Sequence, residues 1–122
     1  MLSALKEAGQ NLAVISNKPD AAVQPGAKRF FALWLDLAVG ETPGVRRKPW
    51  PDMLEAAAEE LDVALARCLY VGDTEVDLET ARAANIDCAA CTWGFRTREQ
   101  LIAAGASLLF DTPAELTAFL LS

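Results

Sequence analysis

The sequence contains no histidine among its 122 residues. This absence excludes histidine general bases, Ser-His-Asp triads and zinc sites that depend on imidazole ligands. Cysteine is also scarce, and Cys88 and Cys91 form a Cys-x-x-Cys pattern inside an apolar stretch that is expected to be a strand. An odd spacing on a strand sends the two side chains to opposite faces. We therefore interpret Cys68, Cys88 and Cys91 as small hydrophobic core residues rather than metal or redox groups.

Positive charge and long apolar runs are scarce as well. The net charge is −6, and the only basic cluster is Arg46-Arg47-Lys48. A nucleic-acid surface needs more clustered Lys and Arg than this. No apolar stretch approaches the ~20 residues of a membrane span, and the N-terminus lacks the basic start and apolar centre of a signal peptide. We therefore expect a cytoplasmic protein that binds neither nucleic acid nor a membrane.

Apolar residues are abundant, at 52% of the chain, which is enough for a hydrophobic core. Short apolar runs alternate with segments of helical composition, a pattern typical of βαβ units and a parallel sheet. We predict one α/β domain over residues 1–122, a three-layer Rossmann-like fold with a mostly parallel sheet of about five strands. The predicted strands are Leu12–Ile15, Leu35–Gly40, Cys68–Val71, Ile86–Thr92 and Leu108–Phe110. The predicted helices are Leu2–Ala8, Asp20–Phe31 (bent or split at Pro25-Gly26), Asp52–Leu61, Val76–Ala84, Arg96–Ala104 and Pro113–Leu121.

Two carboxylates lie where the third predicted strand passes into a helix. Asp73 follows Gly72 at the carboxyl end of the strand, and Asp77 falls in the first helical turn. Ligands of open α/β sheets bind at that edge, and two acids there suit a hard cation such as Mg²⁺. A structural explanation is also open: Thr74 could cap the helix with Asp77 as the acidic half of a capping box. Asp73 would then be a loop acid favoured by the helix dipole.

Polar residues also follow the first two predicted strands. Ser16 and Asn17 come after the first strand, and Lys48 lies in the long loop after the second. Because the carboxyl ends of parallel strands share one edge, a hydroxyl, an ammonium group and the acids would meet there and could hold a phosphate. Taken singly, Ser16-Asn17 could be a helix-capping turn, and Lys48 could be a solvated loop lysine.

These segments together carry a resemblance to a known family. They are Val14–Pro19, Lys48–Asp52, Tyr70–Asp77 with Ala81 and Ala84 behind it, and Thr92–Phe95. The sequence resembles the haloacid dehalogenase-like phosphohydrolases, and most closely their phosphoglycolate phosphatase branch. The resemblance implies that Ser16 and the Asn17 backbone bind the transferring phosphoryl group, and that Lys48 pairs with the phosphate and with a nucleophilic carboxylate. It further implies that Asp73 binds Mg²⁺, directly or through water, and that Asp77 supports this metal site.

The family's nucleophile is missing from this sequence. In the family an aspartate of an Asp-x-Asp motif on the first strand attacks phosphorus, and water hydrolyses the resulting aspartyl-phosphate. No Asp-x-Asp occurs here, and neither Asp36 nor Asp111 replaces it. The helical cap domain of the branch is also absent. The resemblance therefore implies the C-terminal part of a phosphatase, a core domain without its first strand.

The missing strand has a structural consequence. In the family it lies between the strands that end at Ser16 and at Gly72. Unpaired buried amides cost about 1–3 kcal/mol each. We therefore expect the sheet to close up, or to be completed by the missing N-terminal segment or by another copy of the chain.

The leading functional hypothesis is a Mg²⁺-dependent phosphatase that acts on a small phosphorylated metabolite. As it stands the chain is expected to hydrolyse little or nothing, because no carboxylate is available for the covalent step. The alternative is a non-catalytic phosphate- or metal-binding module, or an interaction subunit completed by another chain. An unrelated flavodoxin-like or receiver-like domain fits less well, because no strand-end aspartate stands ready for phosphorylation in the middle of the chain.

Overall fold

The computed structural model describes residues 2–30 and 36–121. Its strands and helices alternate along the chain, which confirms the predicted α/β class. The strands are β1 (Ala13–Pro19), β2 (Leu37–Glu41), β3 (Tyr70–Gly72), β4 (Cys88–Cys91) and β5 (Leu108–Phe110). The helices are α1 (Leu2–Glu7), α2 (Asp20–Phe30), α3 (Asp52–Glu60), α4 (Glu75–Ala83), α5 (Arg98–Ala103) and α6 (Pro113–Leu121), with a 3₁₀ turn η1 at Leu65–Arg67. Within the described ranges, no helix is long and apolar enough to cross a membrane.

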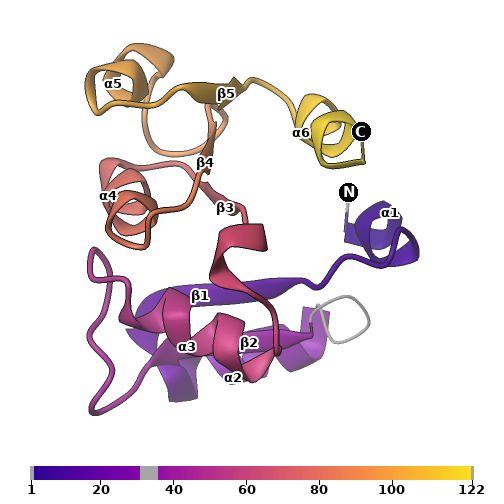
Figure 1. Cartoon of the computed structure of the whole chain (residues 1–122), viewed down its shortest axis with the longest axis vertical. Coiled ribbons are helices and arrows are strands. Elements are labelled where there is room, and N and C mark those ends of the chain that lie inside the picture. Colours follow the sequence, from indigo (N-terminus) through magenta and orange to yellow (C-terminus); the bar gives the residue numbers. More distant parts are fainter. Residues whose placement is uncertain (1, 31–35, 122) are drawn as a thin grey trace.

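The strands form two parallel sheets rather than one (Figure 1). β1 pairs with β2, and β3, β4 and β5 form the second sheet in that order. The expectation that the sheet closes up is wrong, because no backbone pairing joins β1 to β3 among the described residues. Side chains join the sheets instead: Ile15 of β1 packs against a cluster that contains Leu54 of α3 and Tyr70 of β3.

The three-stranded sheet is covered on both faces. On one face, Ala90 of β4 packs with Leu78 of α4 and Leu101 of α5. On the other face, Ala89 packs with Leu116 of α6. Ala89 and Ala90 are 0% and 1% exposed, so the helices approach β4 as closely as alanine allows.

Cys88 and Cys91 behave as the strand spacing predicts, whereas Cys68 lies before β3, is only half-buried and is not the core residue expected. Cys88 packs with Leu78 and Ala90, whereas Cys91 lies on the opposite face with Leu116. All three cysteines are free thiols. Burial raises the pKa of the Cys88 thiol to about 12 and that of Cys91 to about 11. Neither is therefore a thiolate at neutral pH, which agrees with a packing role.

Apart from small shifts at the ends of other elements, the predicted elements that differ most from the structure are β1 and α2. β1 does not end at Ile15 but continues through Asn17 to Pro19, with a register irregularity between Ile15 and Pro19. α2 is not split at Pro25, because a proline removes one backbone donor and the rest of the helix remains paired. Its first turn is tied to β2 by Asp20, whose carboxylate accepts from the Gly40 N–H at 2.9 Å. The predicted ends at Phe31 and Leu35 lie outside the described residues.

Candidate functional site

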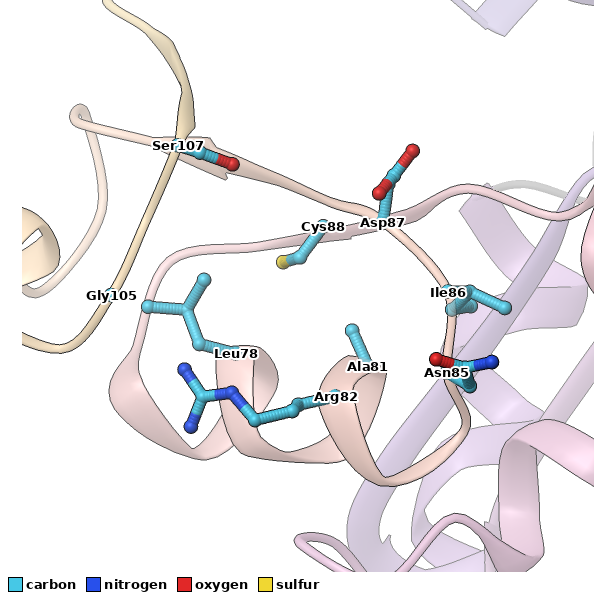
Figure 2. A pocket seen from close by; sticks show the side chains of 9 residues that line it. All are labelled: Leu78, Ala81, Arg82, Asn85, Ile86, Asp87, Cys88, Gly105 and Ser107. Atoms are coloured by element: carbon cyan, nitrogen blue, oxygen red, sulfur yellow. The ribbon is translucent and has the colours of Figure 1, made fainter.

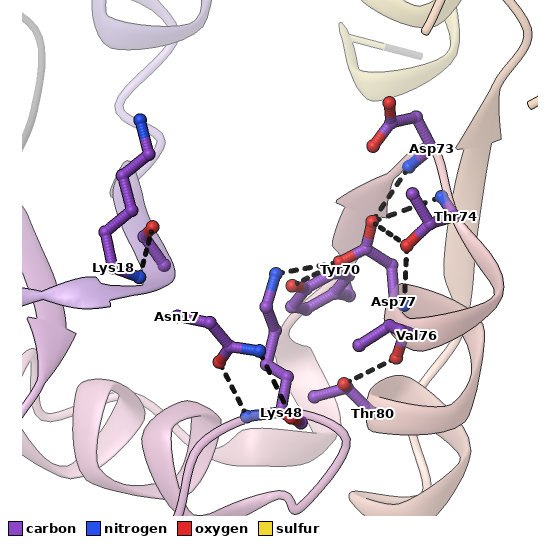
Figure 3. Close-up of polar contacts among 10 residues, drawn as sticks. Asn17, Lys18, Lys48, Tyr70, Asp73, Thr74, Val76, Asp77 and Thr80 are labelled. Carbon is purple, nitrogen blue, oxygen red and sulfur yellow. Dashed lines mark hydrogen bonds and ion pairs between the residues drawn. The ribbon is translucent and has the colours of Figure 1, made fainter. Parts of the chain in front are cut away.

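Asp77 begins the site as a helix-capping residue. Its Oδ2 accepts from the backbone N–H of Thr74 at 3.3 Å and of Asp73 at 3.0 Å (Figure 3). The Thr74 hydroxyl in turn accepts from the Asp77 N–H, so the capping box considered from the sequence is present. The structural explanation of this segment is therefore correct, and the acidic pair is anchored at the start of α4.

The other carboxylate oxygen of Asp77 accepts hydrogen bonds from two further side chains. Oδ1 accepts from the Lys48 ammonium at 3.0 Å and from the Tyr70 hydroxyl at 2.9 Å. Asp77 is only 5% exposed, and its burial raises its pKa. The hydrogen bond from the Asp73 N–H and the Lys48 ammonium outweigh that effect, so the pKa of Asp77 lies below its ordinary value. Asp77 is therefore an ionised carboxylate that caps a helix and holds a lysine at the same time.

Two residues of β3 accommodate this carboxylate: Gly72 because it has no side chain, and Tyr70 because its hydroxyl donates a hydrogen bond. A Cβ on Gly72 would overlap the Cβ of Asp77, so only glycine allows the side chain to rest on the strand. Burial raises the pKa of the Tyr70 hydroxyl far above its usual range, so Tyr70 acts as a neutral hydrogen-bond donor to Asp77. The Lys48 ammonium lies 5.8 Å from the centroid of the Tyr70 ring, within reach of a cation–π contact.

Lys48 is also held at its backbone. The Asn17 amide nitrogen donates to the Lys48 carbonyl at 3.2 Å, and the Asn17 amide oxygen accepts from the Lys48 N–H at 2.9 Å (Figure 3). The Lys48 side chain is 15% exposed, and the Lys48–Pro49 peptide bond is cis. Lys48 thus contacts β1 through its backbone and α4 through its ammonium group, which makes it a polar connection between the two sheets.

Ser16 is a predicted site residue whose side chain makes no hydrogen bond to Asn17, Lys48, Asp73 or Asp77 among the described residues. Its hydroxyl accepts from the Lys18 N–H at 3.1 Å. Hydrogen bonds link Asn17, Lys48, Asp77 and Asp73 in one chain of contacts, whereas Ser16 is linked to that chain through its neighbour Asn17. The structure therefore brings Asn17, Lys48, Asp73 and Asp77 into one network. Asn17 joins it through its side-chain amide, and the phosphate contact implied for its backbone stays a prediction.

Asp73 is fixed by the segment Thr92–Phe95, which the resemblance includes but to which it gives no role at the site. Its Oδ2 accepts from the Phe95 N–H at 3.0 Å. A Cβ on Gly94 would overlap the same oxygen, so Gly94 is needed for the close approach of the two segments. The following Arg96 forms a two-pronged ion pair with Glu75, with N–O distances of 2.8 and 3.0 Å. This pair lowers the pKa of the Glu75 carboxyl and raises that of the Arg96 guanidinium.

The donor set can be tested against a Mg²⁺ site. Both oxygens of Asp77 receive hydrogen bonds, whereas no described residue donates to Oδ1 of Asp73. Within residues 2–30 and 36–121, no three acidic or cysteine side chains cluster as a metal cage. Mg²⁺ is commonly bound by one or two carboxylates together with waters and a phosphate. The residues fit such an open site, with Asp73 as the side chain able to bind the metal.

A hollow lies away from this network, at the opposite ends of the strands (Figure 2). It is bounded by α4, by the start of β4 at Cys88 and by Ser107 before β5. Arg82 is one of its lining residues and donates to the Ala104 carbonyl at 3.2 Å. None of the predicted site residues lines this hollow.

The structure is an α/β fold with parallel strands, and it gathers an asparagine, a lysine and an aspartate pair near the edge where such folds bind ligands. Residues 1–85 match the haloacid dehalogenase-like hydrolase family, so the chain belongs to this family. It is 36% identical over 120 residues to a phosphoglycolate phosphatase from Colwellia psychrerythraea, covering 94% of this chain and 51% of that protein. It is 35% identical to the plasmid-encoded enzyme of the same name from Cupriavidus necator, covering 98% and 52%.

A solved structure gives the same result. A crystal structure from Lactobacillus delbrueckii subsp. bulgaricus, described provisionally as a phosphoglycolate phosphatase, superposes with a TM-score of 0.96 at 40% identity. The match covers 99% of this chain and 51% of that structure. The chain therefore spans about half the length of the curated relatives that it matches.

Proposed function

We propose that this chain supplies the phosphate- and metal-binding part of a Mg²⁺-dependent phosphomonoester hydrolase of the phosphoglycolate phosphatase type. The observation that carries the proposal is the hydrogen-bonded network from Asn17 through Lys48 and Asp77 to Asp73. It places a cation and a carboxylate with an available oxygen at the carboxyl ends of strands from both sheets. Such an edge is where α/β proteins bind phosphorylated ligands.

Each residue would have a defined task toward a small phosphorylated metabolite. Lys48 would neutralise phosphate charge, and its own position is set by Asn17 and Asp77. The Ser16 hydroxyl accepts from Lys18 and donates to no described residue, so its proton is available to a phosphate oxygen. Asp73 would bind Mg²⁺, which when present would neutralise and orient the phosphoryl oxygens. Asp77 would support that site from behind, through the backbone of Asp73.

The covalent step of the family requires the nucleophilic aspartate of an Asp-x-Asp motif, and this sequence contains no such motif. β1 and β3 each pair on one side only within the described residues, and Val14 and Val71 on these strands are 40% and 43% exposed. Unpaired strand edges with exposed valines accept a further strand readily. We infer that a strand from an N-terminal segment or from a second copy completes the sheet there. By itself the chain would hydrolyse little or nothing.

A non-catalytic binding module is the second candidate. It is favoured by the same pair of observations: the Lys48–Asp77 network is intact, while the sequence has no Asp-x-Asp motif. Such a module would bind phosphate with Mg²⁺ and would not turn over. A cytoplasmic setting suits either candidate and stays a prediction.

Adding the missing nucleophile strand as a separate peptide would distinguish the hydrolase from the binding module. Hydrolysis of phosphoglycolate and of p-nitrophenyl phosphate would be measured with and without Mg²⁺, before and after addition of a peptide carrying the nucleophile strand of a relative. Mg²⁺-dependent turnover that needs the peptide and disappears in Asp73→Asn supports the hydrolase. Phosphate binding without turnover in any mixture supports the module. Robust turnover by the chain alone contradicts the proposed inactivity.

The source of the added strand can be examined separately. Size-exclusion chromatography with light scattering would detect a dimer if two copies complete each other. A monomer at all concentrations argues against exchange between copies and leaves the N-terminal segment as the donor.

A further inference from the structure

We propose that the Glu75–Arg96 ion pair is a positioning device for Asp73. It holds the segment after β4 against the aspartate, so that one carboxylate oxygen is fixed by a backbone amide and the other stays available. The inference rests on the proposed function, in which Asp73 binds Mg²⁺.

Two parallel connections join the same two segments. One is the 3.0 Å bond from the Phe95 N–H to Asp73, and the other is the ion pair between Arg96 and Glu75 at 2.8 and 3.0 Å. Phe95 and Arg96 are adjacent, and Glu75 lies two residues after Asp73. The planar fork of arginine fits a carboxylate in one orientation, so the pair fixes the direction of the segment as well as its distance.

The contact between Gly94 and Asp73, which the ion pair helps to maintain, is tightly packed. Gly94 approaches Asp73 so closely that a side chain of even one carbon atom at position 94 would overlap the Asp73 Oδ2. The Phe95 side chain, in contrast, is 86% exposed and cannot hold the segment by packing. The segment is therefore held in part by its polar contacts, of which the two-pronged ion pair is one.

The pair also controls charge next to the proposed metal site. The guanidinium of Arg96 feels the negative charge of Asp73 as well as that of Glu75. While Glu75 neutralises it, Arg96 leaves Asp73 available to a cation. If Glu75 is replaced by glutamine, the released guanidinium becomes a competitor of Mg²⁺ for Asp73.

A matched control lies two residues away. Arg98 forms an ion pair with Asp111 at 3.0 and 3.2 Å, and this pair is also partly exposed. It connects the start of α5 to the residue after β5 and does not contact Asp73. Arg98→Ala therefore removes a partly exposed arginine pair from the same region and leaves both the Glu75–Arg96 pair and the hydrogen bond from Phe95 to Asp73 in place.

The first test follows the Phe95 amide by NMR hydrogen exchange, without metal or phosphate. We expect Arg96→Ala and Glu75→Gln each to speed its exchange about threefold, the size typical of an exposed ion pair, and Arg98→Ala to leave it unchanged. Charge alone would shift exchange in opposite directions in the two variants, so acceleration in both identifies lost positioning. Unchanged Phe95 exchange in Arg96→Ala and Glu75→Gln overturns the proposal.

The second test measures Mg²⁺ affinity by calorimetry. Glu75→Gln is expected to weaken binding at least about threefold more than Glu79→Gln, which removes the same charge from the exposed face of α4. Equal effects of the two variants contradict the role of the pair. If wild type and Asp73→Asn bind Mg²⁺ alike, the proposed metal site fails, while the amide exchange still decides whether the pair positions Asp73.

Discussion

The two sheets hold their parts of the site in different ways. In the three-stranded sheet, Asp77 is fixed by contacts close in sequence, namely the capping box with Thr74 and the Asp73 amide at the end of β3. The Asp73 carboxylate itself accepts from the Phe95 N–H, 22 residues away. In the two-stranded sheet, the lysine is fixed across 31 residues by the Asn17 side chain. Asp77 is thus anchored by local signals at the start of α4, whereas Lys48 and the Asp73 carboxylate depend on contacts between distant segments.

The strands of the two sheets also differ in how deeply they are buried. Ala89 and Ala90 of β4 are almost fully buried between helices, whereas Val14 of β1 is 40% exposed. The sheets meet through Ile15 in a side-chain cluster and through the Lys48–Asp77 ion pair. This difference implies that breaking the ion pair should loosen the lysine more than the aspartates.

Removal of Asp77 should have the largest effect. Asp77→Ala leaves the Lys48 ammonium and the Tyr70 hydroxyl without their buried acceptor and removes the acidic half of the capping box of α4. Loss of one partner of a buried ion pair costs about 3–5 kcal/mol of unfolding free energy, measured by urea denaturation. Asp111→Ala breaks an exposed pair and should cost below about 1 kcal/mol. Similar losses in the two variants would contradict the difference in burial.

Tyr70→Phe should have an intermediate effect. The substitution keeps the ring under the lysine but removes the 2.9 Å hydrogen bond to the Asp77 carboxylate. A bond to a charged group contributes about 1.5–3 kcal/mol. Urea denaturation should show a loss in this range, with the amide protection of α4 retained. A variant as stable as wild type would mean that Tyr70 contributes only its ring.

Asn17→Ala should act on the lysine side alone. It removes both hydrogen bonds to the Lys48 backbone, which together contribute about 1–3 kcal/mol. The amides of the loop around Lys48 should exchange faster, while the Phe95 amide should not change. Equal acceleration at both places would show that the two halves of the site are not held independently.

The pH dependence of stability gives the smallest signal. Because the pKa of Asp77 is lowered in the folded state, its stabilising contribution is present above the unfolded pKa of about 3.9 and is lost as pH falls through the folded value. The stability difference between wild type and Asp77→Asn should therefore shrink below about pH 4. A difference that stays constant down to the acid transition would argue against an ionised Asp77.

Sequence reasoning predicted the features that depend on neighbouring residues. The strand-to-helix junction at Asp73 and the cap at Thr74 were predictable because glycine, threonine and acids mark such junctions locally. The capping explanation and the site explanation are compatible, because the two oxygens of Asp77 serve different partners.

The features that were missed depend on chain segments that meet only in the fold. The Phe95 amide leaves no mark in the sequence, since every residue except proline carries one. The pairing of Glu75 with Arg96 spans 21 residues, and its prediction needs the exact end of β4. The split of the sheet was likewise unpredictable, because strand composition does not determine which edges pair.

Titration of inorganic phosphate into the protein, with and without Mg²⁺, tests most directly whether the two halves form one site. We predict Mg²⁺-dependent binding that is lost in Lys48→Met and in Asp73→Asn, each from a different half. Phosphate binding that persists in both variants, or that ignores Mg²⁺, would contradict a single shared site.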